Sequence, residues 1–496
     1  MTGPRRLAAT PAKGLALASG AQQPQRMSSL VERDLAVFWH PCSQMRDYQD
    51  FAPLEIVSAQ GCRLTLRDGR QILDAVSSWW CKSLGHGHPG VRRRIQQQLD
   101  RFEHVIAANT TNEPLVTLCE RLLRMANGEP GPAWGPDAPA GRGSGHFGKV
   151  FLADNGSTAV EIALKMALQA HAQRGQPQRT HFAALEGGYH GETVGALSVG
   201  DLGLYADPYR ALMFPVTKLG PLPLRLGPHD PRWLDAAAEW PAIEAALAPL
   251  AGTLAAIIYE PVLQAAGGMR LYSPALLGQL LAWADAHGVY LIADEIAAGM
   301  GRLGTMLASH LAPGQGVLPA VLPDFALLSK GLTAGYLPLS AVLTTDAIYG
   351  AFDGDWSERR GFLHSNTYTG NALGVAAALG ALDAYATEDV LAHVACEGAH
   401  LRAALDQAAR TRPSLTGVRG CGMVAAVELR GPDGGSLDPA HRTGYRVYRE
   451  AVRRGALLRP LGDTLYLFPP LNTAAADIDQ MIAVLTDSVD AVVGTG

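Results

Sequence analysis

The sequence predicts an α/β protein built on a mostly parallel sheet flanked by helices. Short apolar segments alternate with longer helical stretches along the middle of the chain, which is the order that parallel strands with crossover helices require. Each apolar segment is continuous rather than alternating, as expected for strands buried on both faces. With 496 residues, 48% of them hydrophobic and 55 of them glycine, the chain can form a large core with many tight turns.

Four segments read as buried strands: residues 149–154, 255–259, 289–294 and 324–329. A polar residue stands at or just after the end of each of them, namely Ser157, Glu260, Asp294 and Lys330. In parallel sheets, ligands bind beyond the carboxyl ends of the strands. We therefore expect these four side chains to converge on one site.

Two helices have recognisable starts. The helix after the first strand has Thr158 and Glu161 at the spacing of a capping box. A later helix is expected to begin with Ser273 as N-cap and Pro274 as its first residue, and to end at Gly288.

The residues at the strand ends suit pyridoxal phosphate (PLP). A lysine buried like Lys330 has a lowered pKa, and its neutral amine forms Schiff bases with carbonyls. Asp294 can pair with a pyridine nitrogen and keep it protonated, and the turn at 155–157 offers backbone N–H groups to a phosphate. Tyr189 can stack on the ring. Each residue alone also has a structural interpretation as a strand-end lysine, a helix cap or a core aromatic, so the prediction depends on the combination.

Two motifs resemble those of class III aminotransferases of fold-type I. Residues 292–304 are similar to the family's DE-x-x-x-G-x-G-R-x-G signature, and residues 328–338 are similar to its lysine motif. The resemblance runs from about Phe38 to the C-terminus. It implies a large PLP-binding domain, and a smaller α+β domain formed from both chain ends. The expected boundaries are residues 29–90 and 376–496 for the small domain and residues 91–375 for the large one.

Within the family, six segments resemble the branch that transfers an amino group from S-adenosylmethionine to 8-amino-7-oxononanoate in biotin biosynthesis. These segments are residues 39–41, 78–80, 154–157, 189–193, 459–462 and 466–470. Cys42 stands where this branch usually has a tyrosine, so the amino donor stays open. The alternative is another class III aminotransferase, with lysine as donor or an ω-amino acid as substrate.

The resemblance also implies a role for individual residues. Those expected to bind the cofactor are Lys330, Asp294, Gly156, Ser157, Tyr189 and, from the other subunit of a homodimer, Thr367. Those expected to bind substrate are Trp79, Trp80, Tyr466 and Arg459. An arginine matches a carboxylate with two parallel hydrogen bonds, which suits Arg459 to one end of a long keto acid. The two tryptophans suit the wall of an apolar pocket, although a place in the core is the alternative.

Composition argues against other classes of partner. The net charge of −5 gives no sign of nucleic-acid or membrane-surface binding, and no apolar run is long enough to span a bilayer. The six cysteines are scattered without CxxC spacing, so we expect a reducing, cytoplasmic environment. No metal site is predicted, because His86, His88 and His190 lack a carboxylate or cysteine at ligand spacing.

Three segments lie outside this pattern. Residues 1–28 are expected to form a disordered tail or to precede the true start, with a targeting segment as the alternative. Residues 128–148 read as a Gly- and Pro-rich surface insertion, and residues 219–232 as a second loop. The glycines at 143–148 match nucleotide-binding motifs formally, but a strand is expected to follow them instead of a helix, so we expect no nucleotide there.

Overall fold

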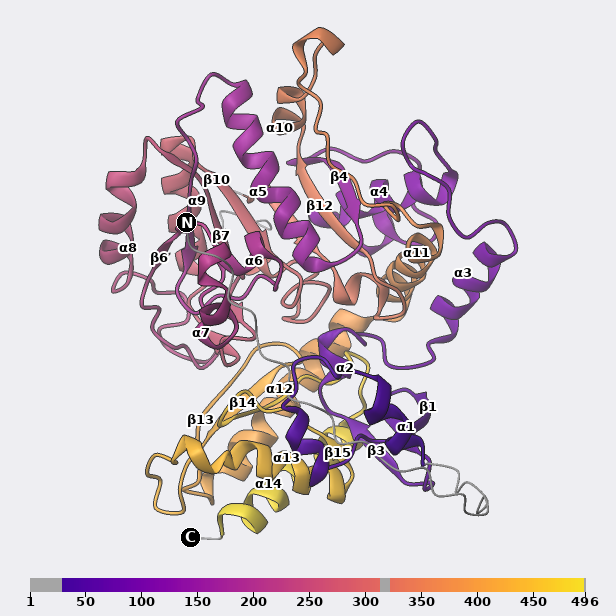
Figure 1. The fold of residues 1–496 in the computed structure, drawn as a ribbon, viewed down its shortest axis with the longest axis vertical. Coiled ribbons are helices and arrows are strands. Elements are labelled where there is room, and N and C mark those ends of the chain that lie inside the picture. The colour runs from indigo at the N-terminus through magenta and orange to yellow at the C-terminus, as the bar shows by residue number, and fades with distance from the viewer. Residues whose placement is uncertain (1–28, 313–321, 495–496) are drawn as a thin grey trace, which may run out of the picture. The chain divides into compact units, whose positions relative to one another are not determined.

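The computed structural model describes residues 29–312 and 322–494 (Figure 1), which form two compact units divided after Glu55. The predicted tail, residues 1–28, lies outside the described residues. In the first unit, α1 (Leu30–Val37) is capped by Ser29, whose hydroxyl accepts a hydrogen bond from the N–H of Glu32. The carboxylate of Glu32 accepts one from the N–H of Ser29 in return, which completes a capping box. The short helix η1 (Met45–Gln49) follows.

A seven-stranded sheet forms the centre of the second unit in the part of the chain that is described. Its order is β4-β12-β11-β10-β7-β5-β6. The strands are β4 (Phe147–Ala153), β5 (His181–Leu185), β6 (Thr217–Leu219), β7 (Leu254–Tyr259), β10 (Tyr290–Asp294), β11 (Phe325–Leu328) and β12 (Ser340–Thr345). Among these strands β12 alone runs in the opposite direction, antiparallel to both β4 and β11. Its link from β11 is too short for a crossover helix. The predicted mostly parallel sheet is confirmed.

Both faces of this sheet are buried. Along β10, Tyr290 and Ile292 pack on the side of α5 (Gly156–Gln173), whereas Leu291 and Ala293 pack on the side of α9 (Ala275–His287). Successive residues of a strand point to opposite faces, so a strand covered on both faces must be apolar throughout. This explains the continuous apolar runs in the sequence. Figure 1 shows α5 beside the strands of the sheet.

Further helices surround the sheet. They are α3 (Pro89–Leu99), α4 (Glu113–Ala126), α6 (Val194–Val199), α7 (Gly203–Ala206), α8 (Trp240–Leu247), α10 (Asp346–Ala351) and α11 (Ala372–Thr387). The apolar α11 is buried, and its Asp383 forms ion pairs with Arg94 and Arg121 at 2.7 and 2.9 Å. None of the described helices is long and apolar enough to cross a membrane.

Three smaller sheets accompany the large one in the described residues, and one of them joins strands from the two ends of the chain. One contains β1 (Ile56–Gln60), β2 (Arg63–Leu66), β3 (Gln71–Asp74) and β15 (Ala456–Leu457), with β15 parallel to β3. Another contains β13 (Leu415–Gly420), β14 (Ala425–Leu429) and β16 (Thr464–Leu467), and β8 (Leu263–Gln264) pairs with β9 (Arg270–Leu271). The helices here are α2 (Ser77–Trp80), α12 (Val390–Arg410), α13 (Thr443–Arg454) and α14 (Ala475–Val493). The domain boundaries at 90 and 375 stay predictions.

Two predicted helix starts were wrong. Asn155, rather than Thr158, caps α5, and its side chain accepts a hydrogen bond from the N–H of Thr158 at 3.1 Å. The carboxylate of Glu161 instead accepts from the backbone N–H of Gly195, because α6 packs beside α5. Similarly, Pro274 occupies the N-cap position of α9 and the helix begins at Ala275.

The insertion at 128–148 is not a surface loop throughout. A short helix, η2 (Gly131–Trp134), buries Trp134 to 4% exposure in the core beside α4. Arg121 of α4 donates a hydrogen bond to the carbonyl of Trp134 at 2.6 Å. One large aromatic therefore anchors a segment whose composition suggested solvent exposure. As predicted, the glycines at 143–148 lead into a strand, β4, rather than a helix.

Candidate active site

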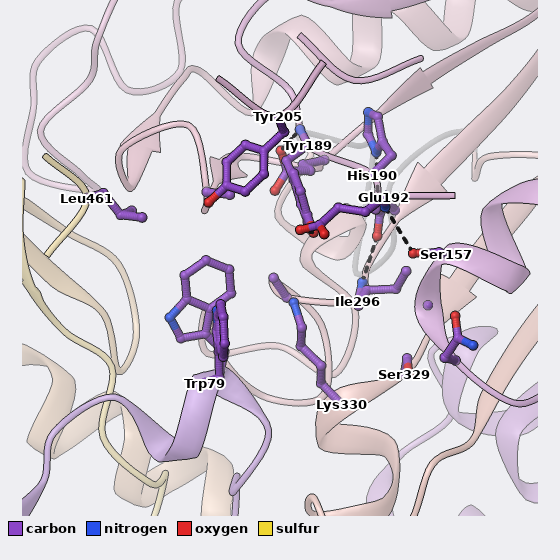
Figure 2. Close-up of a pocket in the computed structure, with 18 of the residues that line it drawn as sticks. Trp79, Ser157, Tyr189, His190, Glu192, Tyr205, Ile296, Ser329, Lys330 and Leu461 are labelled. Atoms are coloured by element: carbon purple, nitrogen blue, oxygen red, sulfur yellow. Dashed lines mark hydrogen bonds and ion pairs between the residues drawn. The ribbon is translucent and has the colours of Figure 1, made fainter. Parts of the chain in front are cut away.

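A cavity of about 370 Å³ lies at the carboxyl ends of the large sheet. It brings together all four strand-end residues that the sequence singled out: Ser157, Glu260, Asp294 and Lys330. Tyr189, from the loop after β5, also lines it. Figure 2 shows the side chain of Lys330 extending into the space between Trp79 and the residues around Tyr189.

Lys330 is the second residue after β11, which ends at Leu328, and its backbone is left-handed with φ 44°. Its Nζ lies 4.8 Å from the centre of the Trp80 ring. Burial lowers the pKa of Lys330, while the carboxylates of Asp294 and Glu260 act in the opposite direction. The structure thus surrounds this amine with low-dielectric walls that favour its neutral, nucleophilic form.

Asp294, the last residue of β10, is fixed by two hydrogen-bond partners. Its Oδ2 lies 2.7 Å from Nδ1 of His190, and its Oδ1 accepts a hydrogen bond from the N–H of Ile296 at 3.1 Å. Both His190 and Asp294 are buried. This pairing is not visible in the sequence, where His190 is considered only as a metal ligand and rejected, because the two residues are 104 positions apart. The place of His190 directly after Tyr189 was the available signal.

Glu260, just after β7, is a second buried carboxylate beside Asp294. Burial and the nearby charge of Asp294 raise the pKa of Glu260 to about 8. The backbone N–H groups of Tyr189 and Ala265 donate to its two oxygens at 2.9 and 3.0 Å, which opposes that rise. Glu260 thereby ties the loop that carries Tyr189 to the end of β7.

The start of α5 forms an anion-binding turn. The first N–H groups of a helix have no partner within it, and the side chain of Asn155 satisfies that of Thr158. Gly156 and Ser157, the first two residues of the helix, both line the cavity, so the positive end of the helix lies at its wall. The hydroxyl of Ser157 accepts from the N–H of Glu192 at 3.3 Å. A side chain at Gly191, whose φ is 121°, would collide with that hydroxyl.

These groups fit a flat phosphorylated pyridine. A helix N-terminus can bind the phosphate, a buried carboxylate can hold a ring proton, and a lysine can react with an aldehyde. Tyr189 forms part of the wall, and its hydroxyl donates to the carboxylate of Glu192 at 3.0 Å. The residues present are therefore those that PLP requires.

The opposite wall carries the four residues expected to bind substrate. Trp79, Trp80, Arg459 and Tyr466 all line the cavity. Nε1 of Trp80 donates a hydrogen bond to the hydroxyl of Tyr466 at 3.1 Å, and the guanidinium of Arg459 lies 4.1 Å from the centre of the Trp79 ring. Apolar rings thus lead to a planar cation, an arrangement suited to a chain that ends in a carboxylate.

Two residues singled out from the sequence lie elsewhere. Thr367 is exposed in the loop before α11 and is not among the described residues that line the cavity. Cys42 belongs to the first unit, where it is exposed and has a φ of 49°.

The aminotransferase class-III family model matches residues 44–489. This chain belongs to the class III aminotransferases. The resemblance seen in the two sequence motifs is therefore confirmed across most of the chain, and the reaction class is the transfer of an amino group.

Relatives and solved structures agree with this family. The chain is 40% identical over 452 residues to the adenosylmethionine-8-amino-7-oxononanoate aminotransferase of Synechococcus elongatus, covering 91% of this chain and 98% of that protein. The Helicobacter pylori enzyme of the same name is 35% identical, covering 93% and 98%. The crystal structure of the Methanocaldococcus jannaschii enzyme of that name superimposes with a TM-score of 0.83 at 30% identity, covering 93% and 99%.

A PLP-bound amine transaminase from an uncultivated Pseudomonas species gives a TM-score of 0.81 at 33% identity, covering 92% of this chain and 99% of that one. The architecture of this chain is thus that of the fold-type I PLP-dependent transferases.

Proposed function

We propose that this class III aminotransferase uses PLP to transfer the amino group of S-adenosylmethionine to 8-amino-7-oxononanoate. The products are the 2-oxo acid of the donor and 7,8-diaminononanoate, an intermediate of biotin biosynthesis. The main support is the cavity itself, where Lys330 and Asp294 face a wall formed by two tryptophans and Arg459. The names of the relatives support the same choice of substrates.

The residues of the site would divide the work as follows. Nζ of Lys330 would hold the cofactor covalently, and the N–H groups of Gly156 and Ser157 would bind its phosphate. When bound, PLP acts as an electron sink for the carbanion formed at the substrate α-carbon. Asp294 would hold a proton on the pyridine nitrogen, and His190 would fix the orientation of that carboxylate.

Lys330 would also move the proton. As a neutral amine, Lys330 would take the proton from the substrate α-carbon as general base and deliver it to the cofactor as general acid. The low-dielectric surroundings lower the pKa of Lys330, which favours the base form that this step needs. Arg459 would bind the substrate carboxylate, and Trp79 and Trp80 would exclude water from the apolar chain. The two half-reactions then follow each other at one site.

A homodimer in the cytoplasm completes the proposal. Leu363 and Tyr368, which stand close to Thr367 in the sequence, are exposed, and such apolar side chains are typical of a subunit interface. Through that interface Thr367 would reach the phosphate of the partner's cofactor. Five of the cysteines form no disulfide, which suits a reducing compartment; they are Cys62, Cys81, Cys119, Cys396 and Cys421. Light scattering of the purified enzyme at micromolar concentration should give the mass of a dimer, and a monomer would refute this part.

A donor screen tests the substrate assignment. We expect S-adenosylmethionine to convert the bound cofactor to its amino form, seen as loss of the absorbance near the visible edge. Conversion by lysine or an ω-amino acid instead would establish the alternative aminotransferase. Replacing Lys330 with alanine should abolish both the absorbance and turnover. Lys149→Ala is the matched control, because Lys149 directly follows the glycines at 143–148, where we expect no nucleotide to bind. A loss of activity in this variant would contradict that expectation.

A further inference from the structure

Residues 77–80, which carry both pocket tryptophans, form a left-handed helical turn. The φ values are 50° at Ser77, 46° at Ser78, 69° at Trp79 and 71° at Trp80. The N–H of Trp80 donates to the carbonyl of Val76 at 2.8 Å, which closes the turn. This conformation is unfavourable for every residue with a Cβ, because the Cβ approaches the following carbonyl oxygen. Such backbone persists only where surrounding contacts hold it, and it concentrates at ligand sites.

One buried carboxylate holds this turn. Asp74 is the last residue of β3 and is fully buried. Its Oδ1 accepts a hydrogen bond from the N–H of Ser78 at 2.9 Å, and its Oδ2 accepts one from the hydroxyl of Ser78 at 2.7 Å. Nε2 of His86 lies 3.0 Å from the same Oδ2. Backbone hydrogen bonds in both directions between His86 and Gly61 fix the histidine in turn. We call Asp74, Ser78 and His86 the Asp74 clamp.

The handedness of the turn decides where the two rings point. Trp80 extends inward, where it is 5% exposed, bonds to Tyr466 and lies against Lys330. Trp79 stays 41% exposed, and the guanidinium of Arg459 lies over its ring. A right-handed turn between the same ends would send these side chains in different directions, because Cβ directions follow the backbone dihedrals. The pocket wall therefore exists only while the left-handed turn does.

We propose that the Asp74 clamp is a positioning device that sets the pocket wall recognising the apolar chain of the acceptor. Asp74, Ser78 and His86 act through Trp79 and Trp80 rather than on the substrate. The identity of the acceptor rests on the proposed function, whereas the link between clamp and turn rests on the geometry alone.

Two substitutions of Ser78 separate this role from simple space filling. Ser78→Ala removes the hydroxyl that donates to Asp74 but keeps the Cβ that opposes the left-handed backbone. Ser78→Gly removes both, and glycine adopts this conformation readily. We expect Ser78→Ala to raise the KM for 8-amino-7-oxononanoate by about tenfold, the lower end of the effect of losing a buried hydrogen bond to a charged group. Ser78→Gly should remain within about threefold of wild type.

The control is Ser58→Ala, an exposed serine on β1, which should leave the KM unchanged. All variants should retain the cofactor absorbance. If Ser78 only filled space, glycine would be the more harmful substitution, because it deletes more atoms. That order of effects, or no effect of alanine, would overturn the proposal.

Amide hydrogen exchange of the holoenzyme tests the clamp without any substrate. The N–H groups of Trp80 and Cys81 close the turn, and they should exchange faster in Ser78→Ala than in wild type and Ser78→Gly. Equal exchange in wild type and Ser78→Ala would refute the clamp. If instead the proposed acceptor is wrong, wild type will not turn over 8-amino-7-oxononanoate, but Ser78→Ala will still exchange these two N–H groups faster than wild type and Ser78→Gly.

Discussion

Replacing Arg459 with lysine should weaken recognition of the acceptor's carboxylate while leaving the pocket intact. The guanidinium lies 4.1 Å from the centre of the Trp79 ring, and a lysine keeps the positive charge and much of that contact. What lysine lacks is the planar fork that donates two parallel hydrogen bonds to a carboxylate. Losing one of these bonds to a charged group costs about 1.5–3 kcal/mol, or roughly 10- to 150-fold in kcat/KM.

The assay should follow only the acceptor half-reaction, because the donor also carries a carboxylate. Enzyme loaded with pyridoxamine phosphate is mixed with 8-amino-7-oxononanoate or with its methyl ester, and the return of the PLP absorbance is timed. Wild type should prefer the acid, and Arg459→Lys should lose most of that preference. Arg101→Lys, a change on an exposed surface, should keep it. If Arg459→Lys slows the acid and the ester equally, the arginine does not bind the carboxylate and the argument fails.

Three further substitutions have effects that the geometry predicts. Tyr466→Phe leaves the buried Nε1 of Trp80 without its acceptor and should cost about 1–3 kcal/mol in urea unfolding; an unchanged midpoint would contradict this. Burial lowers the pKa of Lys330, so the folded apo-protein binds fewer protons there than the unfolded chain does between the lowered value and 10.5. The free energy of unfolding of the apo-protein should therefore rise with pH between the lowered pKa and 10.5. Urea unfolding of Lys330→Met over the same pH range should show no such rise. Gly191→Ala introduces a Cβ that collides with a serine hydroxyl at the anion-binding turn, so the Kd for PLP should rise about tenfold, whereas Gly252→Ala, with open space around its Cβ, should bind PLP normally.

The sequence predicted those parts of the fold that local patterns determine. Continuous apolar runs predicted the buried strands, because a strand covered on both faces leaves no polar position along its length. The rule that ligands bind beyond parallel strand ends then brought Ser157, Asp294 and Lys330 together, and the structure places all three around one cavity. Local patterns were less reliable for helix starts, since Asn155 rather than Thr158 caps α5.

Contacts between distant segments were not accessible from the sequence. The pairing of His190 with Asp294 joins residues 104 positions apart, and the burial of Trp134 depends on α4 lying beside the insertion. Neither leaves a periodic pattern, because each involves a single side chain whose partner is set by how helices and sheet pack. Composition alone therefore predicts a surface loop at 128–148.

The two tryptophans of the pocket show which properties the sequence determines and which depend on the tertiary structure. The sequence by itself determined that Trp79 and Trp80 stand next to each other in a chain whose motifs are those of an aminotransferase. Only the tertiary structure decided that they face the cavity, because a left-handed turn is unfavourable for residues with a Cβ. The turn exists only where Asp74, at the end of β3, and His86, in the loop beyond it, come together and hold Ser78 in place.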